Sequence, residues 1–208
     1  MVAERGGRGR CVALVAPFVG RDIVFRLLME LFHATGRDRR VRMISISGQG
    51  GIGKSRLAWE LEKYLDGLVE PVWWHHGRSP SYGSGITFWA LGEMVRSRCG
   101  LVEHDDESTT RSRVAETVAR FVPEDSDRAW IESALLTLLG IEHAVASTEQ
   151  LFPAWRTFFE YIAQQGTTLM VFEDLQWACL LYTSPSPRDL RQDLVCRLLL
   201  EKRGGGGG

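Results

Sequence analysis

The chain has 208 residues, of which 44% are hydrophobic and 25% are charged, and its formal net charge is -1. These values are typical of a globular protein with one sizeable core, and they offer no electrostatic argument for binding nucleic acid or an anionic membrane. The longest apolar run near the start falls well short of the ~20 residues of a membrane helix, and four scattered cysteines indicate no disulfide framework. We therefore expect a cytoplasmic protein.

Residues 1–16 are expected to be a poorly ordered extension that precedes a domain beginning at residue 17. The stretch PFVGRDIVFRLL, residues 17–28, predicts an extended segment that ends at Gly20. Asp22 can cap the helix that follows, whose apolar residues recur through Leu31 and Phe32. On the residues alone, Phe18 and Val19 are core positions.

The strongest motif follows an apolar, β-branched run at residues 41–47, which predicts a buried parallel strand. The next residues fit the phosphate-loop pattern G-x-x-x-x-G-K-[ST], and they are Gly48, Gln49, Gly50, Gly51, Ile52, Gly53, Lys54 and Ser55. The glycines let successive N–H groups converge on phosphates at the positive end of the next helix. Lys54 is expected to reach the phosphates, Ser55 to ligate Mg²⁺, and Arg56 to adjoin them. The pattern therefore predicts a site for ATP and Mg²⁺.

The middle of the chain is interpreted mainly as scaffold. The pattern predicts a second strand at residues 71–75 and helices at 109–121, 127–139 and 148–165. Phe88 and Trp89 are expected in the core rather than stacked on a base. His75 and His76 are adjacent in a strand and so point to opposite faces, which makes them a poor metal chelate.

A second candidate site follows the run TTLMVFED, residues 167–174. A parallel strand here would bring Glu173 and Asp174 to the sheet edge where the phosphate loop lies. One acid would hold Mg²⁺ and the other would polarise the attacking water, which makes both of them, with Lys54, candidate catalytic residues. A solvent-exposed strand end without a catalytic role is the alternative.

Three segments together resemble the AAA-type and STAND signalling ATPases: VGRD at 19–22, the phosphate loop, and VFEDLQWA at 171–178. The resemblance implies that Phe18, Val19 and Gly20 line an adenine pocket. It leaves Arg21 either as a structural hydrogen-bond donor or as a base contact. It also implies that Glu173 takes the metal position and Asp174 the second position, although the commoner order is Asp then Glu.

The segment SYGSGITFWALGEMVR, residues 81–96, resembles ATPase modules attached to class III adenylate or guanylate cyclases and to large bacterial transcription regulators. The predicted strands and helices together indicate a three-layer α/β/α fold with a mostly parallel sheet, in which residues 43–47 are central and 169–172 adjoin them. The resemblance implies a nucleotide-dependent switch that controls a cyclase or DNA-binding output domain in the same polypeptide, with possible self-association. A nucleotide-gated binding module without turnover and a small-molecule P-loop kinase are the alternatives.

The composition changes abruptly at residue 179, and the chain ends in five glycines. As protein, this tail predicts a loop, a short helix and a flexible end. Residues 179–189 and 193–202 also resemble two translated strings of a sequencing adapter, so we expect residues 179–208 to be non-native and the domain to be cut off after 178. On that interpretation the sheet has an unpaired edge beside 169–172, and the chain binds ATP weakly and turns it over slowly or not at all.

Overall fold

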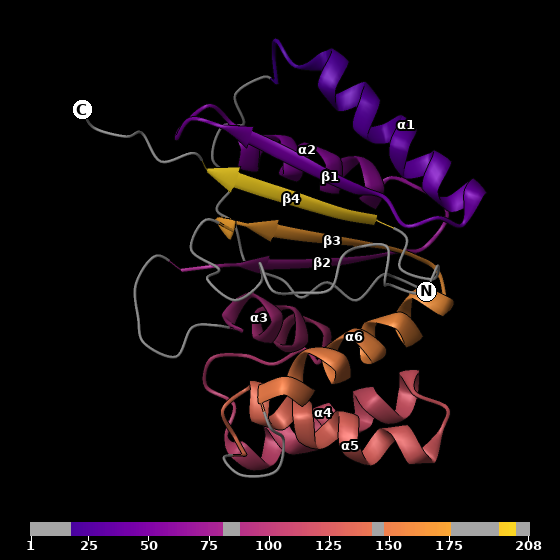
Figure 1. The fold of residues 1–208 in the computed structure, drawn as a ribbon, viewed down its shortest axis with the longest axis vertical. Helices are drawn as coiled ribbons and strands as arrows, with labels where there is room; N and C mark the ends of the chain where they lie inside the picture. The colour runs from indigo at the N-terminus through magenta and orange to yellow at the C-terminus, as the bar shows by residue number, and fades with distance from the viewer. Residues whose placement is uncertain (1–17, 81–87, 143–147, 176–195, 203–208) are drawn as a thin grey trace.

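A computed structural model describes residues 18–80, 88–142, 148–175 and 196–202 (Figure 1). The elements in chain order are α1 (Asp22–Asp38), β1 (Met43–Gly48), α2 (Lys54–Asp66), β2 (Val72–Arg78), α3 (Trp89–Arg98), α4 (Glu107–Phe121), α5 (Asp125–Leu138), α6 (Thr148–Gln164), β3 (Thr167–Glu173) and β4 (Cys196–Lys202). No helix in these ranges is long and apolar enough to cross a membrane.

The four strands form one parallel sheet in the order β1-β4-β3-β2 (Figure 1). Two predictions about this sheet are wrong. Strand β1 lies at one end of the order rather than in the centre, and β4 separates it from β3. Strand β3 is paired on both sides, so the expected free edge beside residues 169–172 is absent from the described sheet. The separation of β1 from β3 and the pairing of β3 on both sides have the same cause, because residues 196–202 form a strand where the sequence predicted a short helix.

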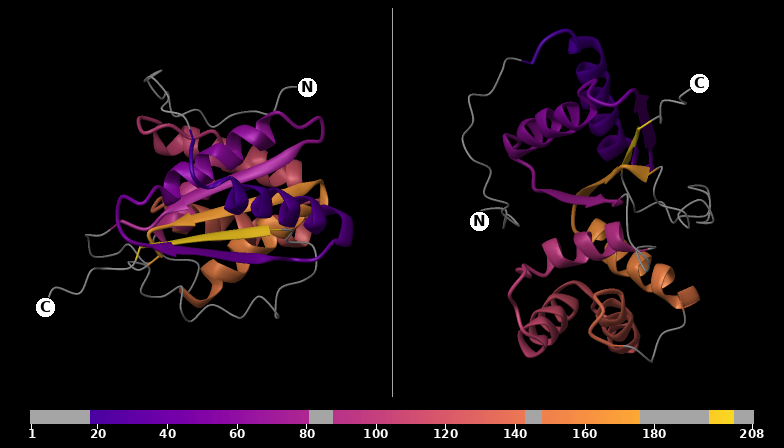
Figure 2. Two further views of the ribbon diagram at one scale, coloured as in Figure 1. Left: turned by 90° about the horizontal axis from the view of Figure 1, so that it is seen from above. Right: turned by 90° about the vertical axis from the view of Figure 1, so that its left-hand side faces the viewer.

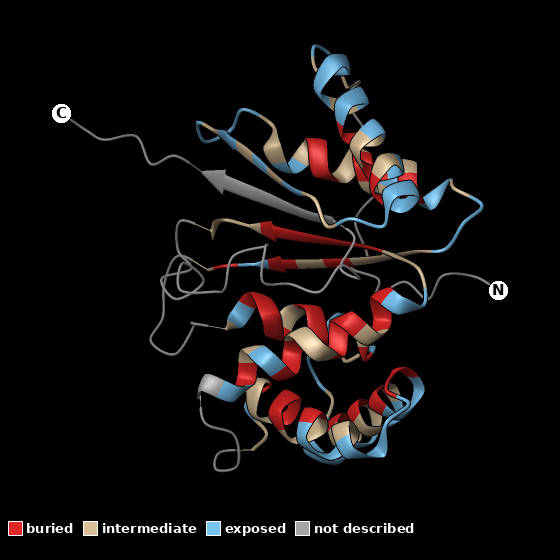
Figure 3. Cartoon of the chain, turned by 45° about the vertical axis from the view of Figure 1, so that its right-hand side comes forward, coloured by how far each residue is buried: buried red, intermediate tan, exposed pale blue. Residues whose placement is uncertain are grey.

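Helices cover both faces of the sheet, as the right-hand view of Figure 2 shows. Successive side chains of β3 point alternately to the two helical layers on either face of the sheet. Leu169 and Val171 pack against α1 and α2. Met170 and Phe172 pack into the core formed with α3 to α6. This strand is buried on both faces (Figure 3), which accounts for its nearly continuous apolar sequence.

The helical predictions at residues 109–121, 127–139 and 148–165 agree with α4, α5 and α6 to within two residues. The capping prediction for Asp22 is wrong, because Asp22 is the first residue of α1 and Arg21 stands at the N-cap without a side-chain bond. Phe88 packs against the core. Trp89 does not, since it begins α3 on the outer side, 50% exposed, with the Arg96 guanidinium 5.8 Å from its ring centre.

Strand β2 touches α3 most closely at Gly77. A Cβ atom at this position would lie 2.2 Å from the carbonyl oxygen of Ala90. Because the obstacle is backbone, we expect Gly77→Ala to lower the free energy of unfolding by about 3 kcal/mol, at the upper end of ordinary overpacking. Urea denaturation measures this loss. Gly92→Ala is the matched control, since its nearest atom would be 3.6 Å away and a helical glycine replaced by alanine gains up to about 1 kcal/mol.

His75 is buried between β2 and α6, with its ring 4.6 Å from that of Phe159. Burial, aided by the charge of Arg98, holds its pKa well below the usual value. The unfolded chain therefore takes up a proton below about pH 6.5 that the folded chain does not. Stability is expected to fall as the pH drops from 6.5 towards 5, by up to about 1.4 kcal/mol per pH unit.

The urea midpoint measured across this pH range tests the His75 prediction, with His75→Leu as the comparison. In the variant, the free energy of unfolding should depend less steeply on pH, by the equivalent of about one proton. Equal slopes in the two proteins would show that His75 takes up its proton in the folded state as readily as in the unfolded chain.

Candidate functional site

The loop between β1 and α2 contains two glycines in the left-handed backbone region. Gly53 stands at the N-cap of α2 with φ 93°, and Gly51 has φ 80°. Both values lie in the left-handed region, which favours glycine. A Cβ atom added to Gly51 would meet nothing within 4 Å, so the space beside the loop is open. Gly48 ends β1 and leads directly into this loop.

Lys54 is the first residue of α2 and lies back across the loop. Its Nζ donates to the carbonyl oxygens of Gly48, at 2.8 Å, and Gln49, at 2.9 Å. The ammonium group is thus held over the same loop whose N–H groups are expected to face phosphate. Ile52 and Gly50 form the exposed tip of the loop. Ser55 follows one position into the helix.

Arg21 ties the N-terminal flank to the loop, because its guanidinium donates to the carbonyl oxygen of Ile52. The sequence left Arg21 either as a structural hydrogen-bond donor or as a base contact. The contact with Ile52 is of the structural kind. Phe18 is half-buried, with its ring 5.7 Å from that of Phe25. Val19 is 78% exposed, so the prediction that it is a core residue is wrong, and Gly20 is also exposed. Their part in an adenine pocket stays a prediction.

Arg56, the last of the predicted loop contacts, lies along the outer side of α2. Its Nε donates to the Glu60 carboxylate at 2.9 Å, and its guanidinium lies 4.4 Å from the centre of the Trp59 ring. Both of these contacts lie within α2. A contact with nucleotide stays a prediction for this residue.

Glu173 ends β3 and meets residues from two other elements. Its Oε2 lies 3.3 Å from Nε2 of His76 on β2, and its side chain is 12% exposed. The pKa of Glu173 is lowered, first by the hydrogen bond with His76 and then by one with the Ser55 hydroxyl, against the opposing effect of burial. Ser55 and Glu173, which the sequence predicted as metal ligands, thus lie near enough for the hydroxyl to influence the pKa of the carboxyl.

Asp174 is placed differently from Glu173. Its backbone has φ 58°, an uncommon value for a residue with a side chain. Its Oδ2 accepts a hydrogen bond from Nε of Arg78, the last residue of β2, at 2.8 Å. This bond is the main reason that the pKa of Arg78 is raised. The two neighbouring acids thus have separate partners, Ser55 and His76 for one and Arg78 for the other.

His76 and Arg78 were missed as site residues by the sequence argument. Alternation along β2 places them on one face and His75 on the other, as predicted for the histidine pair. The missing step was the pairing of β2 with β3, which sets Arg78 opposite Glu173. The local sequence does not show which strands pair when, as here, the two parallel segments are far apart along the chain.

The donor atoms suit a hard divalent cation bound with a triphosphate. A hydroxyl and a carboxylate supply oxygen ligands, and Mg²⁺ usually keeps only one or two protein carboxylates beside phosphate and water. No group of three or more His, Cys, Asp and Glu residues that could hold a metal occurs in the described part of the chain. A hydroxyl and a single carboxylate thus fit Mg²⁺ held jointly with phosphate.

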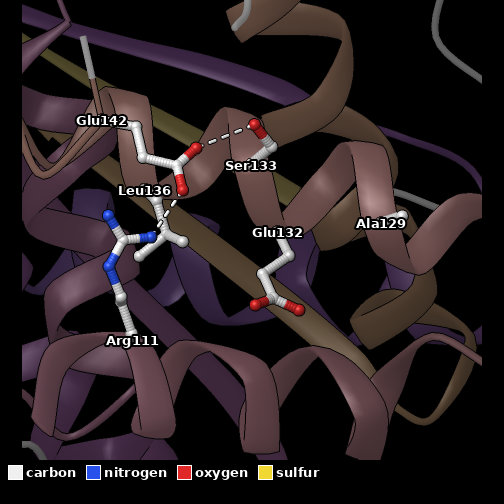
Figure 4. A pocket seen from close by; sticks show the side chains of 6 residues that line it. All are labelled: Arg111, Ala129, Glu132, Ser133, Leu136 and Glu142. Carbon is white, nitrogen blue, oxygen red and sulfur yellow. Dashed lines mark hydrogen bonds and ion pairs between the residues drawn. The ribbon is translucent and has the colours of Figure 1, made fainter. Parts of the chain in front are cut away.

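A hollow in the helical layer is a separate feature (Figure 4), lined by Arg111, Ala129, Glu132, Ser133, Leu136 and Glu142. Arg111 donates to Glu107 at 2.9 Å and to Glu142 at 2.5 Å, and Ser133 donates to Glu142 at 2.9 Å. The bonds from Arg111 and Ser133 lower the pKa of Glu142. These contacts join α4 to the end of α5, and we interpret the hollow as part of the scaffold.

The sequence is similar to a known protein family. A family model described as an AAA ATPase domain matches residues 17–195. The match begins at the predicted start of the domain and extends past its predicted end at residue 178. No curated protein matches the sequence.

Proposed function

The chain belongs to the AAA ATPase domain family, and from that premise we propose that it binds ATP with Mg²⁺ as the nucleotide-dependent switch of a multidomain signalling or transcription-regulating protein. The observation that carries this proposal is the loop itself, in which Gly51 and Gly53 have left-handed backbone angles and the Lys54 ammonium lies over the loop carbonyl oxygens. A purely structural loop would need neither the open space beside Gly51 nor an ammonium group held over its backbone.

Each residue has a defined task in the proposed complex. Lys54 leaves the carbonyl oxygens of Gly48 and Gln49 and donates to the phosphates, where a charge-assisted bond is stronger. Ser55 and Glu173 hold Mg²⁺, which when bound neutralises phosphate charge. Phe18, Val19 and Gly20 are proposed to line the adenine site, as the family resemblance implies.

Asp174 is proposed to polarise the attacking water. General-base assistance is typically worth about 10² to 10⁴ in rate. We therefore expect Asp174→Asn to slow phosphate release by at least about 100-fold while the affinity for ATP changes less than about threefold. Phosphate release and the fluorescence of a labelled ATP measure the two quantities. Asp125→Asn, at a 90% exposed carboxylate on α5, is the matched control and should change neither.

One observation favours the second candidate, a nucleotide-gated binding module without turnover. The Asp174 carboxylate is already bound by Arg78 in the described state, so it is not free to orient water. If the wild-type chain binds ATP but Asp174→Asn leaves its phosphate release unchanged, the binding module becomes the better description. Loss of ATP binding in Asp174→Asn would contradict both candidates.

The output is proposed to be a cyclase or DNA-binding domain in the same intact polypeptide, with residues 179–208 derived from sequencing adapter. Long-read sequencing of the source DNA across the codon of residue 178 tests this part. A frame that continues into further domains would support it and would identify the output. Genomic DNA that encodes residues 179–189 as printed would contradict the adapter origin.

A further inference from the structure

His76 lies at the candidate site, but the proposed function gives it no role. It lies on β2, whereas the loop and the two acids come from α2 and β3. Its ring is on the face of the sheet opposite to that of His75, and it is 38% exposed, so core packing does not explain its position. It nevertheless contacts Glu173, which is far more buried.

We propose that His76 is a positioning residue that holds the Glu173 carboxylate in the orientation in which it binds Mg²⁺ beside Ser55. The inference rests on the proposed function and adds to it a residue from a third element. The contact is between Nε2 of His76 and Oε2 of Glu173, at 3.3 Å. With one oxygen engaged by the imidazole, the carboxylate presents its other oxygen to a cation.

The fold gives this contact a fixed geometry. Strands β2 and β3 pair in parallel with His76 opposite Val171 and Arg78 opposite Glu173. His76 thus reaches Glu173 on a diagonal, two residues along the ladder, from a position fixed by backbone hydrogen bonds. A side chain anchored on a strand holds a neighbouring carboxylate more precisely than one on a loop.

The chemistry needs only the tautomer in which Nε2 carries the proton, since a neutral imidazole then donates to the carboxylate. Hydrogen-bonded partners of metal-binding carboxylates orient them, and losing such a partner typically costs 10- to 100-fold in metal affinity. Such a role predicts an effect on binding that depends on metal. A purely structural role would instead alter stability or all nucleotide binding alike.

The test measures the affinity of the full chain for a fluorescently labelled ATP in excess Mg²⁺ and again in EDTA. The dissociation constant in EDTA divided by the dissociation constant in Mg²⁺ reports the contribution of the metal. For His76→Phe we expect this ratio to fall by about 10- to 100-fold, with the EDTA value within about twofold of wild type. Urea denaturation of the same variants checks that they remain folded.

Two further variants sharpen the result. His76→Gln keeps an N–H donor at similar reach and should restore most of the ratio. His33→Phe removes another exposed histidine, whose Nε2 lies 2.6 Å from the Tyr64 hydroxyl, and should leave the ratio unchanged.

The inference is overturned if His76→Phe keeps the wild-type ratio, if it weakens binding equally with and without metal, or if His76→Gln behaves as His76→Phe does. A wild-type chain that binds no labelled ATP would instead overturn the proposed function itself. Tight wild-type binding with the same affinity in EDTA would leave nucleotide binding standing and remove the metal role of both Glu173 and His76.

Discussion

Replacing Lys54 by alanine is expected to weaken ATP binding by at least about 100-fold. Hydrogen bonds to charged groups contribute about 1.5–3 kcal/mol each, and in the proposed complex the Lys54 ammonium donates to two phosphates. A loss of about 2.7 kcal/mol corresponds to a hundredfold change in the dissociation constant. The substitution should not disturb the core, because Lys54 begins α2 and its Nζ contacts only loop carbonyl oxygens among the described residues. Titration with a fluorescently labelled ATP in excess Mg²⁺ measures the loss.

Lys63→Ala is the matched control for this prediction. Lys63 lies on the same helix, where its Nζ is 3.3 Å from the Glu60 carboxylate and 4.7 Å from the centre of the Trp59 ring. It carries the same charge but stands two turns farther along the helix, so its removal should change the affinity less than about twofold. If Lys54→Ala and Lys63→Ala bound ATP equally well, the loop would not be the phosphate site.

The phosphate loop could be predicted from sequence because its determinants are local. Strand, glycine loop and helix follow one another directly, and each requires particular residue types at fixed spacing. The same holds for α4, α5 and α6, whose apolar residues recur with helical period. Asp106 shows that some local detail was still missed, since the sequence predicted no role for it in the helix that follows. It caps α4 by accepting the N–H of Thr109 at 2.8 Å.

The order of the strands could not be predicted because it depends on contacts between distant segments. β1 and β3 were expected to be neighbours on the strength of their shared role at the site. Parallel strands do not need to adjoin for their C-terminal ends to meet, and β4 lies between them. A short apolar run such as residues 196–202 fits a strand as well as a helix segment, so periodicity alone does not decide between them.

The sequence predicted the residues expected to bind phosphate and metal, but it did not predict the protein residues that contact them. Lys54, Ser55, Glu173 and Asp174 were identified because a phosphate and a metal call for those side chains. His76 and Arg78 were not, because each acts on another protein residue and its relevance appears only with the pairing of β2 and β3. Such partners are properties of the fold rather than of a motif.

The largest expected effect on stability comes from a substitution in the core between β3 and helices α3 to α6. Trp155 on α6 is fully buried, and its ring lies 4.8 Å from that of Phe159 and 6.3 Å from that of Phe172, the residue before Glu173. Trp155→Ala is expected to lower the free energy of unfolding by about 3–5 kcal/mol, through lost burial and the cavity left behind. That is a large part of the 5–15 kcal/mol typical of a domain, so the variant should be largely unfolded at urea concentrations that the wild type withstands.

Two comparisons decide whether this loss comes from packing. Trp155→Phe should lose less than about 1.5 kcal/mol, because it keeps most of the ring volume and removes an indole N–H that has no hydrogen-bond partner in the described structure. Trp130→Ala, at a 38% exposed tryptophan on α5, should cost less than about 1 kcal/mol. Equal losses in Trp155→Ala and Trp130→Ala would mean that α6 does not cover β3 as described. The strand that carries Glu173 and Asp174 would then lack the rigid support on which the geometry of the proposed metal site depends.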